Sequence, residues 1–160
     1  MNKQHHYSTT IHWTGNQGTG TSNYKAFERS HTITVSGKPD IQGSSDPSFR
    51  GDSTKHNPEE LFLSSLSSCH MLWYLHLCAV NGIQVVDYKD PAIATMEETK
   101  DGSGKFTKVV LNPRVVVTDI SMFDKALALH KQANEKCFIA NSVNFTVDHK
   151  ASCELQNIID

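Results

Sequence analysis

The four cysteines, at positions 69, 78, 137 and 153, are the residues best suited to covalent chemistry, because a thiolate is a strong nucleophile. None of them forms a CxxC motif, so the spacing argues against a zinc ribbon and against a thioredoxin-type pair. No apolar signal region follows the first residues, and we therefore expect a cytoplasmic protein. In that compartment thiols stay reduced unless they take part in catalysis.

Cys69 falls within the clearest predicted helix, residues 58–81. Asn57 is a suitable N-cap, and a proline at position 58 is tolerated in a first helical turn. The predicted helix has about 24 residues and a length of roughly 36 Å. Nearly every residue from Met71 to Val80 is apolar. We expect this half to be buried on all sides, by a sheet or by a second subunit.

Helix geometry restricts the thiols that could pair with Cys69. Cys78 lies about 13.5 Å further along the axis and on the opposite side, whereas a disulfide needs Cα atoms within roughly 7 Å. Cys78 is therefore expected in the core, and the partner is Cys137 or Cys153. Cys137 opens a short predicted helical piece, where the helix dipole would lower a thiol pKa. Cys153 lies in a polar C-terminal tail and is expected to be incidental.

Core packing is the plainer interpretation of a helical cysteine such as Cys69, because free cysteine is among the most buried residue types. Four serines precede it within five positions, although serine is a poor residue for a helix interior. This cluster predicts a need for small side chains, either for close approach or for access. It consists of Ser64, Ser65, Ser67 and Ser68.

The remaining pattern predicts a single α+β domain over residues 1–160. A hairpin is expected around Asp101-Gly-Ser-Gly104, because this glycine-rich turn separates two strand-like segments. The expected elements are N-terminal strands within 7–35, a loop at 36–57, strands at 83–88, 92–98 and 106–117 (within 83–117), a helix at 121–136, and a second-cysteine segment with a closing strand at 137–150.

Composition excludes several classes of partner. The chain has 160 residues, of which 15 are Lys or Arg and 17 are Asp or Glu, giving a formal charge of −2. This balance argues against nucleic acid and against an anionic membrane. No apolar run approaches the roughly 18 residues that a membrane span needs. Apolar residues make up 38% of the chain, so part of its core is expected to be buried against a partner chain.

The segment His56-Asn-Pro-Glu-Glu-Leu-Phe-Leu-Ser-Ser-Leu-Ser-Ser-Cys-His70 resembles the signature of the OsmC/organic hydroperoxide resistance family. In that family an Asn-Pro-Glu stretch opens the central helix, and the reactive cysteine follows ten residues after the glutamate. Here Glu59 precedes Cys69 by ten residues. The resemblance extends to the Ile11-His12-Trp13 strand and to Lys136-Cys137-Phe-Ile-Ala. Many members have a proline after the second cysteine, where this chain has Phe138.

The resemblance implies an OsmC-like fold, in which β-sheets wrap a long buried central helix within an intertwined homodimer. It also implies a thiol peroxidase of the oxidative stress response that reduces organic hydroperoxides. Cys69 would become a sulfenic acid, and Cys137 would resolve it as a Cys69–Cys137 disulfide. A dithiol reductant, such as a lipoyl protein, would reopen that bond. No metal, haem or other cofactor is implied.

The same resemblance implies that an arginine held by the motif glutamate, Glu59, stabilises the thiolate. Arg50 lies near the position used by one branch of the family, and Arg29 lies near the region used by another. We select Arg50. For either arginine the alternative is an exposed loop charge, and for Glu59 it is a favourable interaction with the positive end of the helix dipole.

Two other functions stay open at this point. The first is a redox-responsive or small-ligand-binding protein that keeps the fold and turns peroxide over slowly. The second is a metal site built from Cys69, His70, His76 and a cysteine from elsewhere. The second is weaker, because adjacent helical residues point about 100° apart.

Overall fold

The computed structural model of the chain describes residues 3–157. It comprises two compact units, Met1–Leu61 and Phe62–Asp160. The outermost parts of the predicted domain, residues 1–2 and 158–160, lie outside the described residues. Within residues 3–157, neither helix is both long enough and apolar enough to cross a membrane.

The first unit contains a three-stranded antiparallel sheet of β1 (Thr10–Trp13), β2 (His31–Thr34) and β3 (Ile41–Gly43). The first two strands lie within the predicted region 7–35. Trp13 donates its indole N–H to the carbonyl of Glu28 at 2.8 Å. Gly15 is required beside this contact, since a Cβ there would lie 2.0 Å from the same carbonyl oxygen.

The predicted loop 36–57 is more ordered than its composition indicates. It contains β3 and a short 3-10 helix, η1 (Pro47–Phe49). The cap of η1 is Asp46, whose carboxylate accepts a hydrogen bond from the Ser48 backbone N–H at 2.7 Å. Strand pairing therefore extends into a segment whose glycines and prolines favour irregular backbone.

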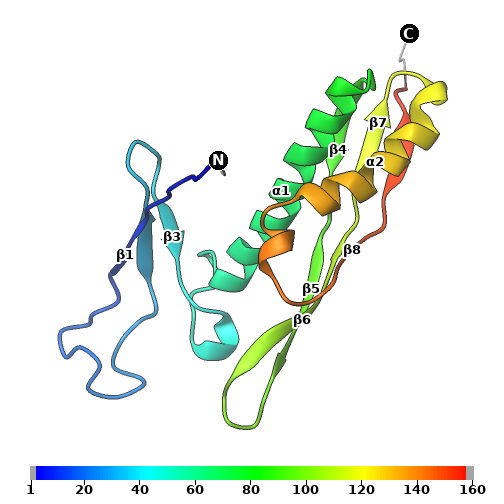
Figure 1. Cartoon of the computed structure of the whole chain (residues 1–160). Coiled ribbons are helices and arrows are strands. Elements are labelled where there is room, and N and C mark those ends of the chain that lie inside the picture. Colours follow the sequence, from blue (N-terminus) through cyan, green and yellow to red (C-terminus); the bar gives the residue numbers. More distant parts are fainter. Residues whose placement is uncertain (1–2, 158–160) are drawn as a thin grey trace. The chain divides into compact units, whose positions relative to one another are not determined.

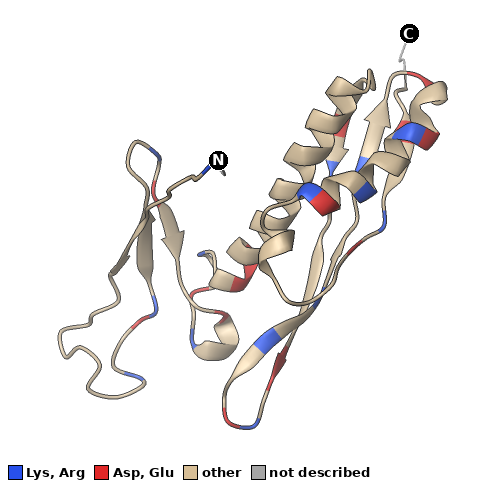
Figure 2. Cartoon of the chain, in the orientation of Figure 1, with Lys and Arg blue, Asp and Glu red and all other residues tan. Residues whose placement is uncertain are grey.

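Helix α1 (Pro58–Val80) confirms the predicted helix to within one residue. Its start is a capping box. Asn57 accepts from the Glu60 backbone N–H at 2.8 Å, and Glu60 accepts in return from the Asn57 backbone N–H at 3.2 Å. Beyond Glu60 the helix carries no Lys, Arg, Asp or Glu, as the tan ribbon of Figure 2 shows.

The second unit contains two three-stranded sheets. One has the order β4 (Val85–Lys89), β7 (Arg114–Val117), β9 (Ser152–Leu155), and the other has β5 (Ile93–Glu98), β6 (Gly104–Leu111), β8 (Val147–His149). The hairpin predicted around residues 101–104 is confirmed, because β5 and β6 pair antiparallel. The single strand predicted over 106–117 is wrong. The chain leaves one sheet after Leu111 and enters the other at Arg114, with Pro113 between them.

Helix α2 (Phe123–Lys136) lies within the predicted range 121–136. Its buried residues repeat at helical spacing, and they pack with residues of α1 and of the first of the two sheets. Figure 1 shows α2 beside the strands of this sheet. The resulting core cluster comprises Tyr74, Leu77, Cys78, Ile83, Val115, Val117, Ala126, Leu129 and Ala133. A second cluster of Leu66, Val109, Leu111 and Val147 lies under the other sheet.

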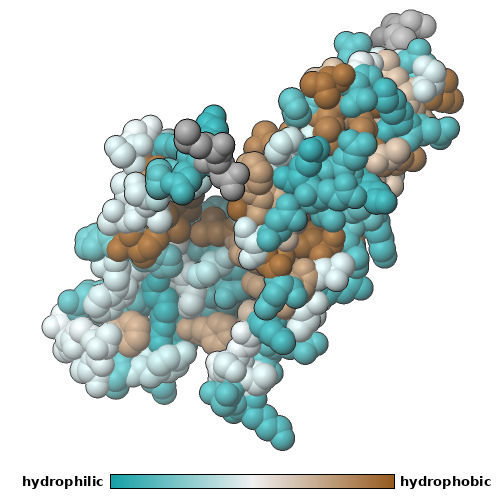
Figure 3. All heavy atoms as spheres, in the orientation of Figure 1, coloured by the Kyte–Doolittle hydropathy of each residue, from teal (hydrophilic) through white to brown (hydrophobic). Residues whose placement is uncertain are grey.

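One side of the apolar half of α1 stays uncovered in the single chain. Leu72 is 62% exposed and Val80 is 65% exposed. Figure 3 shows apolar surface over the C-terminal part of α1. The two sheets of the second unit therefore do not bury this helix on every side.

Candidate functional site

Cys69 and Cys137 are brought together, although 68 positions separate them in the sequence. Cys69 is half-buried within α1, and Cys137 is buried, with 1% of its surface exposed, directly after the last turn of α2. The Cys69 side chain lies close enough to Cys137 to raise the pKa of the Cys137 thiol. The second unit thus contains two neighbouring thiols of unequal accessibility.

The buried member of this pair is held in its protonated form. Burial, together with the neighbouring Cys69 side chain, raises the pKa of Cys137 to about 11, while the Ala140 N–H, which donates to the Cys137 sulfur at 3.4 Å, acts in the opposite direction. The lowering effect predicted from the start of a helical turn is present, in the N–H of Ala140, but burial outweighs it. Cys137 is the C-terminal cap of α2, and the next helical turn, η3 (Ala140–Ser142), begins only three residues later.

Aromatic and apolar side chains flank the thiol pair. Trp73, one helical turn after Cys69, meets Phe138 edge to face with ring centroids 5.7 Å apart. The Lys136 ammonium lies 5.7 Å from the centre of the same indole ring. Leu72, Trp73 and His76 line an open cavity of about 270 Å³ along this part of α1. The surroundings of Cys69 therefore offer apolar surface to an organic group.

Arg50, Arg29 and Glu59 all lie in the first unit, so their action on Cys69 stays a prediction. Arg29 is held locally, because it donates to the carbonyls of Tyr24 and Phe27 and stacks on both of their rings. Arg50 has a left-handed backbone with φ of 65° at the end of η1. Both arginines line a cavity of about 250 Å³. Glu59 lies in the first turn of α1, where its charge favours the helix dipole.

A buried histidine pair was not foreseen from the sequence. The His70 Nε2 atom lies 3.0 Å from His130 Nδ1, and the ring of Tyr74 stacks on His130 with centroids 3.8 Å apart. Burial, together with the neighbouring His149, lowers the pKa of His70 to about 4. Burial, together with His70 and His149, lowers the pKa of His130 to about 3. The signal for His130 was its place among the apolar positions of the predicted helix 121–136.

The metal hypothesis is wrong for the part of the chain that the structure describes, where no group of three or more His, Cys, Asp or Glu residues could hold a metal ion. The reason is the direction of the side chains. His70 points into the core toward His130, whereas His76 is exposed and lies beside Trp73.

The other two cysteines occupy different environments from those of the thiol pair. Cys78 is buried in the core cluster, as predicted from its place in the helix. Cys153 does not lie in an irregular polar tail. It belongs to β9 and packs against the same cluster, because β9 pairs with β7 in a register that places Cys153 beside Val115.

Comparison with known proteins decides the family. The model of the OsmC-like protein family matches residues 51–152. The chain belongs to the OsmC-like protein family. A solved OsmC-like protein of unknown function from Vibrio cholerae has a TM-score of 0.83 and 30% identity, over 93% of this chain and 100% of that one. The uncharacterized protein YmaD of Bacillus subtilis is 26% identical over 148 residues, which are 90% of each chain.

More distant OsmC-like structures share the mixed α+β fold. They include an organic hydroperoxide resistance protein OsmC from Legionella pneumophila, with a TM-score of 0.65 and 18% identity over 96% of this chain and 99% of that one. An organic hydroperoxide resistance protein from Elizabethkingia anophelis has a TM-score of 0.67 and 14% identity, over 98% of this chain and 100% of that one. The family indicated by the Asn57-to-Cys69 segment and the predicted α+β fold class are thus confirmed, whereas the intertwined homodimer stays a prediction.

Proposed function

We propose that this OsmC-like protein is a thiol peroxidase that reduces organic hydroperoxides. The observation that carries the proposal is the contact between a half-buried thiol, Cys69, and a buried, protonated one, Cys137. A second thiol beside the first is what resolution of a sulfenic acid as a disulfide requires. The names of the organic hydroperoxide resistance proteins that share the fold support the same reaction class.

The proposed reaction has three steps. The Cys69 thiolate attacks the terminal oxygen of ROOH, the O–O bond breaks, and protonation of the leaving alkoxide gives ROH and a Cys69 sulfenic acid. The sulfur of Cys137 then attacks Cys69, and the sulfenic OH leaves as water with the Cys137 proton. An external dithiol finally reduces the disulfide by exchange and is itself oxidised.

The first step needs a thiolate. A thiol with the ordinary pKa near 8.5 is only about 3% ionised at pH 7, whereas a pKa near 6 gives roughly 90% at about 3.4 kcal/mol of differential stabilisation. We assign this stabilisation to Arg50, oriented by Glu59, with Arg29 as the alternative. The existing contacts of Arg29 with Tyr24 and Phe27 favour Arg50.

The substrate class follows from the walls of the site. Trp73, Leu72 and Phe138 favour an apolar R group over hydrogen peroxide, which has none. Phe138 is 64% exposed, and Leu72 and Val80 are exposed to a similar degree. Large exposed apolar side chains on neighbouring elements mark an interaction surface. They support the proposal that a second copy of the chain completes the site in a homodimer.

A slower, redox-responsive role is the second candidate. It is favoured by the high pKa of Cys137, about 11, since a protonated resolving thiol attacks a sulfenic acid slowly. In that case the oxidised form of the protein would persist and would itself act as the redox signal.

Peroxide consumption with excess dithiol separates the two functions. Cumene hydroperoxide and hydrogen peroxide are compared with wild type, Cys69→Ser and Cys153→Ser, the last as the matched thiol control. The peroxidase proposal expects rapid turnover of cumene hydroperoxide, complete loss in Cys69→Ser and little change in Cys153→Ser. A single oxidation event without sustained turnover would instead support the redox-responsive role.

A further inference from the structure

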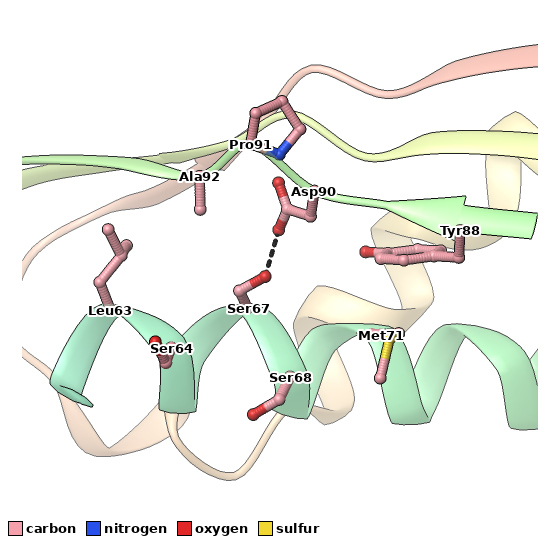
Figure 4. Close-up of a pocket in the computed structure, with 9 residues that line it drawn as sticks. All are labelled: Leu63, Ser64, Ser67, Ser68, Met71, Tyr88, Asp90, Pro91 and Ala92. Atoms are coloured by element: carbon pink, nitrogen blue, oxygen red, sulfur yellow. Dashed lines mark hydrogen bonds between the residues drawn. The ribbon is translucent and has the colours of Figure 1, made fainter. Parts of the chain in front are cut away.

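A second cavity lies between α1 and the segment that joins β4 to β5. It has a volume of about 400 Å³ and is lined entirely by residues of the second unit (Figure 4). Its size falls in the range of small-molecule sites, roughly 300–1,000 Å³. The lining residues are Leu63, Ser64, Ser67, Ser68, Met71, Tyr88, Asp90, Pro91 and Ala92.

This cavity is separate from the thiol pair. Successive residues of an α-helix are rotated by about 100°, so Ser67 and Met71, each two positions from Cys69, lie about 160° away from it around the axis. Cys69 faces the turn that carries Cys137, whereas the cavity faces β4 and β5. A binding role for this cavity is therefore independent of the proposed peroxidase function.

Every polar side chain that lines the cavity ends in oxygen. Three are serine hydroxyls from the cluster that precedes Cys69, and the others are the Tyr88 hydroxyl and the Asp90 carboxylate. Among the described residues that line the cavity, none is Lys, Arg or His. The only formal charge in the wall is thus negative, and the wall complements a ligand that donates hydrogen bonds and carries a positive charge.

The carboxylate is fixed in place. Asp90 Oδ2 accepts from the Ser67 hydroxyl at 2.6 Å, and Oδ1 accepts from the Asn112 backbone N–H at 2.6 Å. A carboxylate has about four acceptor positions, so these two bonds leave others available to a ligand. A preformed acceptor of this kind lowers the ordering cost of binding.

The Tyr88 hydroxyl is an unused polar group beside Asp90. It is buried and finds no hydrogen-bond partner among the described residues. Burial raises its pKa, and the Asp90 charge raises it further, so it stays a neutral phenol. In Figure 4 the ring directs this hydroxyl along α1 toward Ser67 and Asp90. A buried polar group without a partner costs free energy, which a ligand N–H placed there would recover.

The geometry points to a binding site for a small organic ammonium ion with a short apolar body. The ammonium group donates to Asp90 and to the oxygens of Tyr88 and Ser67. The apolar body lies against Leu63 and Ala92, which lie on the far side of Ser67 from Tyr88 (Figure 4). A carboxylate or phosphate ligand is excluded by repulsion from Asp90.

Isothermal titration calorimetry with three probes of similar shape tests this assignment. The probes are 2-phenylethylamine, 2-phenylethanol and phenylacetate, which differ mainly in the charge of the head group. We expect the amine to bind at least roughly tenfold more tightly than the alcohol, a difference of about 1.4 kcal/mol, and phenylacetate not to bind. Equal binding of all three, or no binding of the amine at millimolar concentration, would overturn the assignment.

Variants locate the site. Ser68→Leu places an apolar side chain at an exposed position in the cavity wall and should abolish amine binding, while Ala79→Leu, exposed on the same helix outside the cavity, should not. Asp90→Asn should weaken binding of the amine by roughly tenfold or more. Unchanged binding by Ser68→Leu would place the amine elsewhere. The alternative ligand is a metal ion. It would be indicated if millimolar potassium or magnesium chloride displaced the amine and the same ionic strength of tetramethylammonium chloride did not.

Discussion

Acidification is expected to destabilise this protein through the buried histidine pair. His70 and His130 are 0% and 1% exposed and share one hydrogen bond, and their pKa values in the folded state are about 4 and about 3. In the unfolded chain both return to about 6.5. Since the folded pKa values are depressed, the stabilisation is complete above about pH 6.5 and declines as the pH falls toward the folded values.

The magnitude follows from the proton balance. At pH 5 the unfolded chain carries a proton on nearly every histidine, whereas the folded chain leaves His70 and His130 almost wholly neutral. Each of the two therefore loses about 2 kcal/mol between pH 7.5 and pH 5, or about 4 kcal/mol together. That is a large part of the 5–15 kcal/mol typical of a domain.

Urea unfolding at pH 7.5 and pH 5.0 measures this loss. The double variant His70→Gln/His130→Gln keeps two side chains that can hydrogen-bond to each other but do not titrate, so its pH dependence should be smaller by about 4 kcal/mol. His12→Gln, at an exposed position, is the matched control and should behave as wild type. A double variant with the same pH dependence as wild type would refute the reasoning.

A second readout does not require the variants to fold. Proton NMR of the imidazole C–H signals should show two of the nine histidines still neutral at pH 5 in the folded protein. Titration of all nine near pH 6.5 would contradict the burial of the pair.

Three further outcomes are expected. Asn57→Ala removes the side-chain acceptor of the capping box at the start of α1 and should cost about 1 kcal/mol of unfolding free energy, whereas Asn57→Ser should restore most of it. Leu66→Ala, at a position with no exposed surface, should cost about 2–5 kcal/mol in the same denaturation assay. Cys137→Ser should leave the Cys69 sulfenic acid without a resolving thiol, so that dimedone labelling after one equivalent of cumene hydroperoxide rises well above the wild-type level.

The elements with strong local signals were predictable from the sequence. Helix α1 has a cap residue, a tolerated proline and a glycine stop, and the β5–β6 hairpin has a glycine-rich turn. β3 is only three residues long and β9 pairs with β7, more than 30 residues earlier in the chain, so no local pattern marks either strand. The split between β6 and β7 likewise depends on which sheet each strand joins.

In the candidate site, too, features with a local signal were predictable and those that depend on long-range contacts were not. The resemblance of the Asn57-to-Cys69 segment to the family signature selected Cys69, whose catalytic role stays a prediction. Helix geometry placed Cys78 in the core, where the structure has it. The pKa of Cys137 could not be judged, because its burial comes from residues brought together by the fold. The His70–His130 contact is of the same kind, since 60 positions separate the two rings.

Intact mass after a single oxidation tests the central claim most directly. Fully reduced protein is treated with one equivalent of cumene hydroperoxide and measured under acid, with wild type, Cys137→Ser and Cys153→Ser in parallel. We expect wild type and Cys153→Ser to lose about 2 Da as the Cys69–Cys137 disulfide forms, and Cys137→Ser to gain about 16 Da as a sulfenic acid. Wild-type protein that keeps its mass and all four thiols would contradict the peroxidase account.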